Sequence, residues 1–392
     1  MTLEEVKKRD SETLMPTYAR FSVQLVSGKG ATAKDADGKE YIDFTSGIGV
    51  NSLGYCDDAW VAAVAGQAAV LQHTSNLYYN PLQSALAEKL CGLSGMSKVF
   101  LCNSGAEANE CAVKLARKYG VNMFGAGHTE IVTLKNSFHG RTVTTLAATG
   151  QDEFHRYFTP LTEGFRYAEP SMESVCITVT EKTCAVMLEL IQGEGGVVPM
   201  DPEFVRMLRD FCTRRHILFI IDEVQTGVGR TGAFYCYQKY GVTPDVVTSA
   251  KGLGGGLPVG ACLCAKELGG VLGRGMHGST FGGNPVVCAG ALTVLERVGD
   301  PAFLAETEEK GAYLAACLKK MPGIVSVRGM GLMLGAKPER GTPAEIAAKC
   351  AENGLLVLTA KDVLRFLPPL TITKRELDRG LNILARTLAA FA

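Results

Sequence analysis

The sequence predicts an α/β protein with a large, mainly parallel sheet and a smaller α+β unit. Three observations support this prediction. The chain has 392 residues, which is more than one small core requires. Apolar runs of strand length alternate with helix-like segments through the middle of the chain. Several of these runs end in glycines, acids or a lysine, and the carboxyl ends of parallel strands are where such sheets bind their ligands.

The large sheet is predicted from six apolar runs. The first is followed by a small turn and then by an amphipathic stretch over 106–119, which predicts a helix. Because strands and helices alternate, we expect parallel strands with helices on both faces of the sheet. The six predicted strands cover residues 98–102, 131–134, 184–190, 217–221, 245–249 and 260–265.

The two ends of the chain predict the smaller unit. Residues 1–49 contain a starting helix and then short strands joined by turns. We divide the chain into an N-terminal segment 1–49, a large domain 50–290 and a C-terminal small domain 291–392, and we expect the N-terminal segment to join the small domain. In the last of these, helices are expected at 303–320 and 374–391, and strands at 326–335, 355–358 and 363–367.

The composition argues against several classes of protein. Forty Lys and Arg balance forty Asp and Glu, so no basic surplus points to nucleic acid or to an anionic membrane. No apolar run approaches the roughly 18 residues of a membrane span. The thirteen cysteines are scattered without zinc-like spacing, so we expect small core side chains and no metal. The N-terminus has no signal or transit pattern, and a cytoplasmic location is expected.

Two strand ends carry groups suited to a phosphate and a carboxylate. Gly105 and Ala106 open a helix, and the free N–H groups of a helix N-terminus suit a phosphate, although an ordinary N-cap explains the same pattern. Phe138 and Arg141 follow the second strand. They suit the stacking of a ring and the binding of a carboxylate, and a core Phe with a surface Arg is the alternative.

Two further strand ends carry an acid and a lysine. Asp222 directly follows a continuous apolar run, so its carboxylate lies at the buried edge of the sheet and needs a cationic partner. A protonated pyridine nitrogen, Mg²⁺ or a structural arginine meets that need. Lys251 is followed by four glycines in five residues, which permit close approach of a ligand. Such a lysine forms a Schiff base with an aldehyde cofactor, and a phosphate-binding or surface lysine is the alternative.

A glycine pattern after the fourth strand is typical of a different class of enzyme. Residues 227–232 match G-x-G-x-x-G, and Asp245 follows at about the distance of the ribose-binding acid in dinucleotide-dependent oxidoreductases. Two features count against this interpretation. Residues 222–226 separate the glycines from the strand, and Asp245 begins a strand whereas a ribose-binding acid ends one.

Together the strand ends supply an amine, a buried acid, an aromatic face and a phosphate site. The chain resembles the class III (subgroup II) pyridoxal-phosphate aminotransferases, over nearly its whole length and with the motifs in the family's order. The resemblance implies fold type I, with a large domain around a mainly parallel seven-stranded sheet and a smaller α+β domain. The matching stretches are NSGAEANE (103–110), FHGR (138–141), IQGEGG (191–196), DEVQTGVGRTG (222–232), AKGLGGG (250–256) and GSTFGGNP (278–285).

The resemblance implies how the residues would hold the ring of pyridoxal 5'-phosphate. Lys251 would bind the cofactor as a Schiff base and shuttle a proton during the reaction. Asp222 would pair with the ring nitrogen and keep it charged, so that the ring accepts electrons. Gln225 would hydrogen-bond the phenolic oxygen, and Phe138 would stack on the ring.

The phosphate would be bound from two subunits. Gly105 and Ala106 would donate backbone N–H groups, and Thr280 would reach the phosphate from the neighbouring subunit. The resemblance therefore implies a homodimer with its active sites at the interface. Glu223 and Val224 complete the implied set of cofactor-binding residues.

The resemblance also implies how two amino donors share one site. The implied reaction moves the terminal (δ) amine of N2-acetyl-L-ornithine to 2-oxoglutarate, giving N-acetyl-L-glutamate 5-semialdehyde and glutamate in arginine biosynthesis. Arg141 would hold the carboxylate far from the reacting amine, and Ser279 would contact the acetylornithine. Arg365 would bind the α-carboxylate of glutamate, and Glu194 would mask it while the other donor is bound. A structural ion pair is the alternative for Arg365 and Glu194.

The chain departs from the family pattern in two places, both of which we expect near the active-site entrance. Leu190 follows Glu189 where the family usually has proline, and residues 165–174 lack the usual Asn-Asp pattern. Within the same fold, the alternative donors are succinyl-diaminopimelate, ornithine and 4-aminobutyrate. Outside it, the alternatives are an oxidoreductase and a non-catalytic binding protein. The latter is disfavoured because the lysine, the aspartate and both arginines are present.

Overall fold

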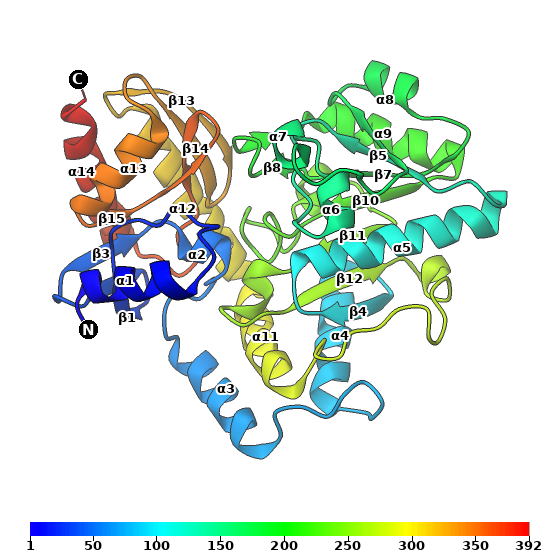
Figure 1. Cartoon of the computed structure of the whole chain (residues 1–392), viewed down its shortest axis with the longest axis horizontal. Coiled ribbons are helices and arrows are strands. Elements are labelled where there is room, and N and C mark those ends of the chain that lie inside the picture. The colour runs from blue at the N-terminus through cyan, green and yellow to red at the C-terminus, as the bar shows by residue number, and fades with distance from the viewer. Residues whose placement is uncertain (392) are drawn as a thin grey trace.

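A seven-stranded sheet forms the centre of the larger lobe in the computed structural model, which describes residues 1–391 (Figure 1). In sheet order the strands are β4 (Lys98–Cys102), β12 (Gly260–Cys264), β11 (Val246–Ser249), β10 (Leu218–Asp222), β7 (Thr183–Leu188), β5 (Glu130–Leu134) and β6 (Phe165–Ala168). Neighbouring strands from β11 to β6 are parallel, and β12 is antiparallel to both β11 and β4. The predicted mainly parallel sheet is confirmed.

All six predicted strands are present, and the seventh, β6, was not predicted. It lies at the edge of the sheet beside β5. Of its four side chains only Ala168 is buried, and Arg166 is exposed. An edge strand with one solvated face has no continuous apolar run, so its sequence gives a weak signal.

Helices cover both faces of this sheet, as predicted. Along β10, Phe219 and Ile221 belong to one apolar cluster, while Leu218 and Ile220 belong to the other, which explains the continuous apolar run. Helix α5 (Gly105–Phe124) packs on one face. Helices on the other side include α4 (Pro81–Ser94), α8 (Met172–Thr178), α9 (Pro202–Arg215) and α11 (Pro285–Val298), and α3 (Asp58–Val70) packs on α11.

The smaller lobe contains two four-stranded sheets and joins the two ends of the chain. The predicted strand over 326–335 is a hairpin of two strands, because Gly331, with φ of +54°, makes a turn within it. One sheet is β13 (Ile324–Met330), β14 (Met333–Pro338), β17 (Val363–Phe366) and β16 (Leu358–Ala360), and the other is β1 (Leu25–Lys29), β2 (Thr32–Asp35), β3 (Glu40–Asp43) and β15 (Leu355–Leu356). Helices α12 (Pro301–Lys319), α13 (Pro343–Glu352) and α14 (Lys374–Ala389) cover these sheets.

Strand β15 pairs in parallel with β3, so the N-terminal segment shares a sheet with the C-terminal part of the chain. Residue 392, the last of the predicted small domain, lies outside the described residues. The remaining elements are short. They are α2 (Ser46–Gly49), α6 (Val143–Ala148), α7 (Asp152–His155), α10 (Tyr237–Tyr240), β8 (Ile191–Gln192), β9 (Val198–Pro199) and the 3-10 turns Lys251–Gly254 and Lys266–Leu268.

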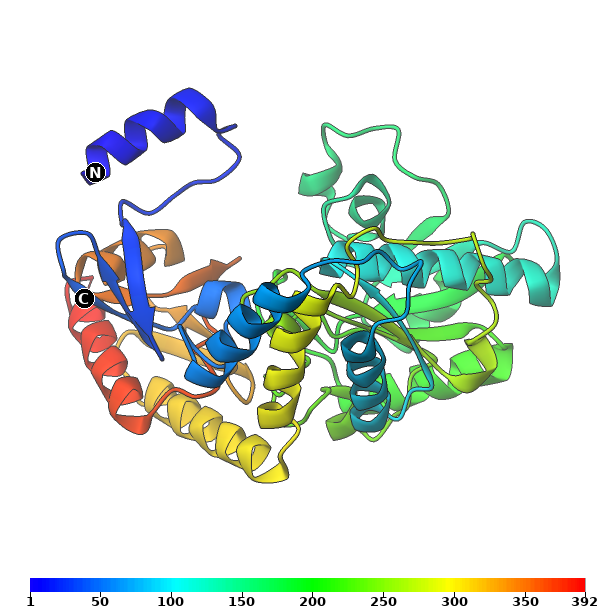
Figure 2. The ribbon, with the colours of Figure 1, turned by 90° about the horizontal axis from the view of Figure 1, so that it is seen from below.

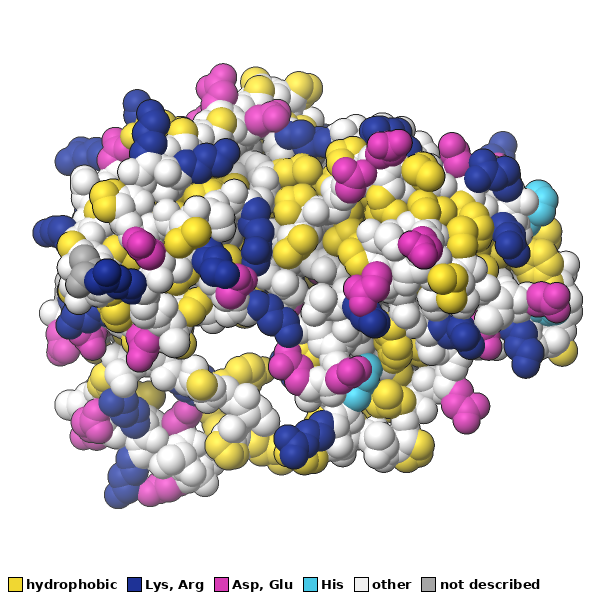
Figure 3. All heavy atoms as spheres, turned by 90° about the horizontal axis from the view of Figure 1, so that it is seen from above, with side chains coloured by type: hydrophobic (Ala, Val, Ile, Leu, Met, Phe, Trp, Pro, Cys, Tyr) yellow, Lys and Arg dark blue, Asp and Glu magenta, His cyan; other side chains and the backbone are white. Residues whose placement is uncertain are grey.

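The first helix, α1 (Leu3–Thr13), stands apart from the body of the molecule (Figure 2). It has no buried residue, and the space-filling view shows a gap between this arm and the rest of the surface (Figure 3). None of the helices described over 1–391 combines the length and the apolar character that crossing a membrane requires. The thirteen cysteines all fall within this range and are free thiols.

Candidate active site

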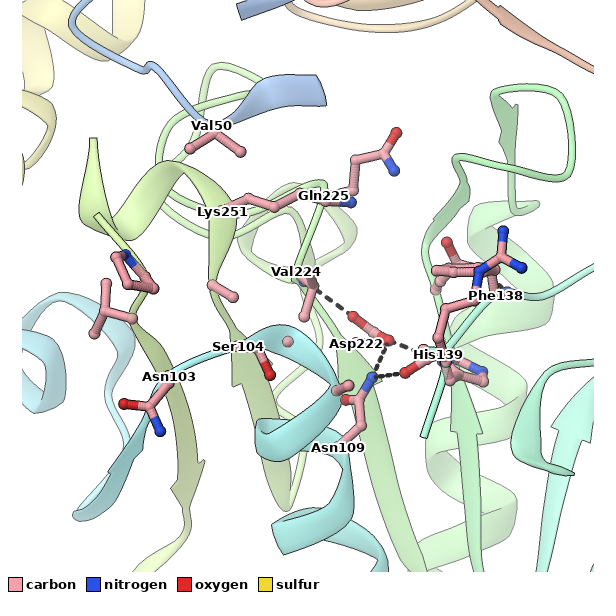
Figure 4. Close-up of a pocket in the computed structure, with 18 of the residues that line it drawn as sticks. Val50, Asn103, Ser104, Asn109, Phe138, His139, Asp222, Val224, Gln225 and Lys251 are labelled. Carbon is pink, nitrogen blue, oxygen red and sulfur yellow. Dashed lines mark hydrogen bonds and ion pairs between the residues drawn. The ribbon is translucent and has the colours of Figure 1, made fainter. Parts of the chain in front are cut away.

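The carboxyl ends of the parallel strands meet at one edge of the large sheet, where a cavity of about 460 Å³ opens (Figure 4). Every strand end that the sequence singled out reaches this cavity. Among the residues that line it are Gly105, Ala106, Phe138, Arg141, Asp222, Val224, Gln225 and Lys251, together with Asn109, His139 and Glu189.

Asp222 is the buried acid of the cavity and is held from three directions. Its Oδ2 accepts a hydrogen bond from Asn109 Nδ2 at 2.8 Å and lies 2.8 Å from His139 Nδ1. Its Oδ1 accepts a hydrogen bond from the Val224 backbone N–H at 3.0 Å. The side chain is only 4% exposed. These contacts fix the direction of the carboxylate, and within residues 1–391 no arginine or lysine pairs with it, so the structural-arginine alternative does not hold.

Asn109 and His139 are site residues whose contacts the sequence analysis did not predict. Asn109 bridges Asp222 to the backbone oxygen of His139, to which its Nδ2 donates at 2.7 Å. Both side chains are buried. A signal for Asn109 exists in the sequence, because it lies four residues after Gly105 and therefore on the same face of helix α5 as the turn that is predicted to bind a phosphate.

Lys251 begins the 3-10 turn after β11 and projects into the cavity from the opposite side (Figure 4). Its φ of +43° is in the left-handed region, which is uncommon for a residue other than glycine and often marks a functional site. Burial lowers the pKa of the Lys251 amine, which favours the neutral, nucleophilic form. The turn is braced by two hydrogen bonds, from Ser52 Oγ to the Gly252 carbonyl at 3.0 Å and from Trp60 Nε1 to the Gly254 carbonyl at 3.1 Å.

Gly105 and Ala106 form the first turn of α5, whose N-cap is Ser104. The Ser104 hydroxyl accepts the Glu107 N–H at 3.1 Å, while the N–H groups at the start of a helix have no acceptor within it. A Cβ on Gly105 would meet Val224 Cγ1 at 2.6 Å, so the close approach of these segments requires glycine. The geometry suits an anion of the size of a phosphate.

Phe138 and Arg141 line the outer side of the cavity. The Phe138 ring packs edge-on against Phe154, with centroids 5.8 Å apart. The Arg141 guanidinium lies 4.5 Å from the Phe154 centroid and 5.6 Å from that of Phe138, and the residue is exposed. The aromatic rings therefore support an arginine that remains accessible to a carboxylate.

Arg365 and Glu194 form a direct ion pair beside the cavity. Arg365 Nη1 donates to Glu194 Oε1 at 2.6 Å and to Gln225 Oε1 at 3.2 Å. The Arg365 side chain is 4% exposed, whereas that of Glu194 is 29% exposed. Burial acts to raise the pKa of Glu194, but the Arg365 guanidinium outweighs it and holds this pKa below its ordinary value. The pair is charged, and its acid faces the open side.

Ser279 and Thr280 lie on the loop before α11 and do not line the cavity of their own chain. Ser279 Oγ accepts hydrogen bonds from Asn103 Nδ2 and from the Gly282 N–H, both at 3.0 Å. Asn103 itself borders the cavity. Thr280 is exposed to solvent.

Glu223, although adjacent to Asp222, faces away from the cavity. It is fully buried, and its carboxylate accepts hydrogen bonds from the Thr226 hydroxyl and from the Tyr237 backbone N–H. Successive side chains of a strand point to opposite faces, so only the first of the two acids reaches the site.

The G-x-G-x-x-G stretch packs against the smaller lobe. Arg230 is buried and donates to the carbonyl oxygens of Leu332 and Pro368, at 3.1 and 2.5 Å. Asp245 accepts from the Phe219 N–H at 2.7 Å and pairs with Arg209 at 2.8 Å. The glycine stretch over 227–232 and Asp245 therefore both have structural partners, which argues against a dinucleotide site at residues 227–245.

The two departures from the family pattern are not at the cavity entrance as expected. Leu190 is fully buried, and residues 165–168 form the edge strand β6. Neither segment lines the cavity, whereas Glu189 does. Among residues 1–391, no cluster of three or more His, Cys, Asp or Glu side chains is arranged to hold a metal ion.

The sheet order, the strand-end lysine and the buried aspartate are those of an enzyme that works at the carboxyl edge of a large α/β sheet. The chain belongs to the class-III aminotransferase family, which it matches over residues 14–388. The resemblance predicted from the sequence motifs is confirmed.

Individual relatives agree with this assignment. The chain is 46% identical over 392 residues to the acetylornithine aminotransferase of Haemophilus ducreyi, covering 99% of this chain and 100% of the relative. Its structure is similar to the N-acetylornithine aminotransferase of Stenotrophomonas maltophilia, with a TM-score of 0.83 and 36% identity over 97% of this chain and 98% of that one. It is also similar to the ornithine aminotransferase of Toxoplasma gondii, with a TM-score of 0.95 and 31% identity over 100% of this chain and 96% of that one.

Proposed function

We propose that the protein is an aminotransferase that moves the terminal amine of N2-acetyl-L-ornithine to 2-oxoglutarate with pyridoxal 5'-phosphate as cofactor. The products are N-acetyl-L-glutamate 5-semialdehyde and L-glutamate, as in arginine biosynthesis. The observation that carries the proposal is one cavity lined by Lys251 and Asp222 and flanked by the masked Arg365. The relative with 46% identity, named acetylornithine aminotransferase, supports the choice of donor.

The residues of the cavity fit the cofactor. When bound, pyridoxal phosphate supplies an aldehyde for an amine and a ring that takes up an electron pair. Lys251 would provide the amine, since its lowered pKa favours the nucleophilic form. The Asp222 carboxylate, held by Asn109 and His139, would keep a proton on the ring nitrogen. The start of α5 at Gly105 binds the phosphate.

Three further side chains complete the proposed cofactor site. Phe138 would cover one face of the ring. Gln225 would offer its Nε2 to the phenolic oxygen, since its Oε1 accepts from Arg365 at 3.2 Å. Val224 packs against Gly105 and shapes the space between ring and phosphate. During the reaction, the Lys251 Nζ would move the proton at the substrate carbon.

Two arginines let two donors use the same site. Arg141 binds the carboxylate far from the reacting amine, which belongs to acetylornithine in one half-reaction and to the glutamate side chain in the other. Arg365 binds the α-carboxylate of glutamate only after Glu194 has left it. With the terminal-amine donor, Glu194 stays in place and neutralises Arg365, and Ser279 contacts the donor. The 2.6 Å ion pair supports this exchange.

Ornithine is the second candidate donor, because the ornithine aminotransferase of Toxoplasma gondii has a TM-score of 0.95 with this structure. A single half-reaction separates the candidates. The absorbance of the bound cofactor is recorded before and after adding N-acetylornithine, ornithine or 4-aminobutyrate, each without an acceptor. Fast conversion by N-acetylornithine alone supports the proposal. Faster conversion by another amine would assign the enzyme to a different pathway. If no cofactor absorbance appears after pyridoxal phosphate is added, the proposed function is wrong.

Replacing Lys251 with alanine should abolish turnover while the protein keeps its fold. The control is Lys266→Ala, a change to an exposed lysine that follows β12 at the sheet edge opposite to the cavity, and it should retain full activity. Circular dichroism checks the fold of both variants. Normal turnover in Lys251→Ala would show that this lysine does not bind the cofactor.

We propose a cytoplasmic homodimer in which Thr280 of one subunit reaches the phosphate bound by the other. Support comes from the exposure of Thr280 and of three apolar side chains around it, Phe281, Leu77 and Tyr78. The last two follow Asn76, whose Nδ2 donates to the Ser279 and Gly282 carbonyl oxygens on the Thr280 loop. A hybrid of Lys251→Ala and Thr280→Val subunits contains one intact site, so mixing should restore roughly half of the wild-type activity per hybrid dimer. If a verified hybrid dimer recovered no activity, Thr280 would not contact the phosphate bound by the other subunit.

Within each subunit we propose residues 50–290 as the cofactor domain and 1–49 with 291–392 as the small domain.

A further inference from the structure

The turn that carries Glu194 joins β8 to β9 and contains three glycines. Gly196 has φ of +111° and Val197 has φ of +58°, so the backbone here adopts a left-handed conformation on both residues. Such a turn needs external contacts to select one conformation. The position of Glu194 over Arg365 therefore depends on what holds this turn.

From the larger lobe, the start of the turn is fixed by two side chains. Glu189 Oε1 accepts the Gly193 N–H at 3.2 Å, and Gln192 Nε2 donates to the Lys135 carbonyl at 2.8 Å. Both contacts lie before Glu194. They leave the second half of the turn to be held from the smaller lobe.

Arg328 on β13 supplies that contact. Its Nε donates to the Gly196 carbonyl oxygen at 2.6 Å, and its Nη2 donates to Asp362 Oδ1 at 2.8 Å. A Cβ on Gly196 would lie 2.6 Å from Arg328 Nη2, so the guanidinium presses directly on the turn. Arg328 is 31% exposed and does not line the cavity.

The two partners of Arg328 belong to the two segments that carry the ion pair. Gly196 lies two residues after Glu194, and Asp362 lies three residues before Arg365 on the turn that leads into β17. Arg328 thus ties the segment of the masking acid to the segment of the masked arginine. The charged groups around it are Asp362 and Lys337, which pairs with the other oxygen of Asp362 at 3.0 Å.

We propose that Arg328 is a positioning residue for donor choice, which holds the Gly193–Val197 turn so that Glu194 stays on Arg365 until glutamate displaces it. This inference rests on the proposed exchange at Arg365. Without Arg328, the second half of the turn loses its hydrogen bond at the Gly196 carbonyl to the smaller lobe, and Glu194 leaves Arg365 more readily. Ligands whose carboxylate occupies Arg365 then bind more tightly, while a terminal-amine donor, which needs the masked arginine, gains nothing.

The test compares Arg328→Gln with wild-type holoenzyme. Two quantities are measured: kcat/KM for the glutamate and N-acetylornithine half-reactions, and the Kd of glutarate, an unreactive dicarboxylate, by calorimetry. The ratio of glutamate to N-acetylornithine kcat/KM should rise about 3- to 10-fold, and glutarate should bind more tightly by a similar factor. Arg328→Lys keeps the charge and one donor and should give an intermediate ratio.

Lys337→Gln is the matched control. It removes a positive charge from the same carboxylate, but in the described part of the chain Lys337 makes no hydrogen bond to the Gly193–Val197 turn. Its ratio and glutarate Kd should stay at the wild-type values. Asp362→Asn serves if Arg328→Gln does not fold, since it leaves Arg328 in place without its charged partner and should shift the ratio in the same direction.

Each outcome is decisive. An equal loss in both half-reactions, or an unchanged ratio and glutarate Kd, would show that Arg328 is only a structural residue. An equally large shift in Lys337→Gln would mean that the positive charge near Asp362, and not the hydrogen bond from Arg328 to Gly196, sets the ratio. Arg365→Ala separates this inference from the proposed function. If it damages both half-reactions equally, the exchange itself is wrong; if it damages mainly the glutamate half-reaction while Arg328→Gln changes nothing, only the role of Arg328 fails.

Discussion

Replacing Glu223 with glutamine should stabilise the protein at alkaline pH and have little effect at acidic pH. Burial raises the pKa of Glu223 to about 7. The carboxylate accepts hydrogen bonds from the Tyr237 backbone N–H at 2.9 Å and from the Thr226 hydroxyl. Glutamine keeps both bonds, because its oxygen accepts from the Tyr237 N–H and its NH₂ group donates to the Thr226 hydroxyl.

The magnitude follows from the pKa in the two states. The carboxyl ionises near 4.5 in the unfolded chain and at about 7 in the folded protein. Between these pH values the folded state binds more protons than the unfolded state, so stability falls as the pH rises. The full effect is about 3 kcal/mol, at about 1.36 kcal/mol for each pKa unit. Most of it, about 2.5 kcal/mol, is lost between about pH 5 and pH 8.

Thermal unfolding of the wild type and of Glu223→Gln at about pH 5 and about pH 8 measures this effect. A chain of 392 residues unfolds with an entropy of about 0.8 kcal/mol/K, so the advantage of the variant in Tm should grow by about 3 °C from acid to alkaline pH. Glu296→Gln, a change to an exposed glutamate of α11, is the control and should show no such growth. An advantage that is equal at both pH values, or a variant that is less stable at the higher one, would refute the reasoning.

Two further substitutions test the cofactor site and the junction of the lobes. Gly105→Ala places a Cβ 2.6 Å from Val224 Cγ1, and the resulting displacement should weaken cofactor binding by about 1–3 kcal/mol. Titrating the apoenzyme with pyridoxal phosphate measures this loss. An unchanged Kd would contradict the close approach of Gly105 and Val224. Arg230→Met leaves the carbonyl oxygens of Leu332 and Pro368 without their donor, so Tm should fall by about 2–4 °C while turnover at low temperature persists. A loss of turnover without a change in Tm would instead give the glycine stretch a role in the reaction.

Much of the fold follows from the period of the apolar residues. The central strands are buried on both faces and read as continuous apolar runs, so their sequence alone predicts them. The edge strand β6 and the hairpin of β13 and β14 were missed because their signals are weak or interrupted. In the edge strand β6, buried residues alternate with solvent-facing ones such as Arg166, so no continuous apolar run marks the strand. The turn at Gly331 is too short for its composition to reveal the boundary between β13 and β14.

The site was predictable where a single residue type decides the chemistry. Lys251 follows β11 and Asp222 ends β10, and the structure brings both to one cavity. From the sequence we expect both adjacent acids, Asp222 and Glu223, at the cofactor, whereas only Asp222 lines the cavity. The alternation of side chains along the strand sends Glu223 into the core, where its neighbours are Thr226 and Tyr237. That distinction needs the exact end of the strand, which composition does not give.

The same alternation of side chains explains the leucine at position 190, where the family usually has proline. Glu189 faces the cavity and accepts the Phe138 N–H at 2.9 Å and the Gly193 N–H at 3.2 Å, so it links the Phe138 segment to the Glu194 turn. Leu190, one residue later, points into the core. Its carbonyl oxygen accepts the Met200 N–H at 2.9 Å, a bond that proline in the same place would also make. A proline-to-leucine change here therefore alters the packing behind the site and leaves the residues that line the cavity unchanged.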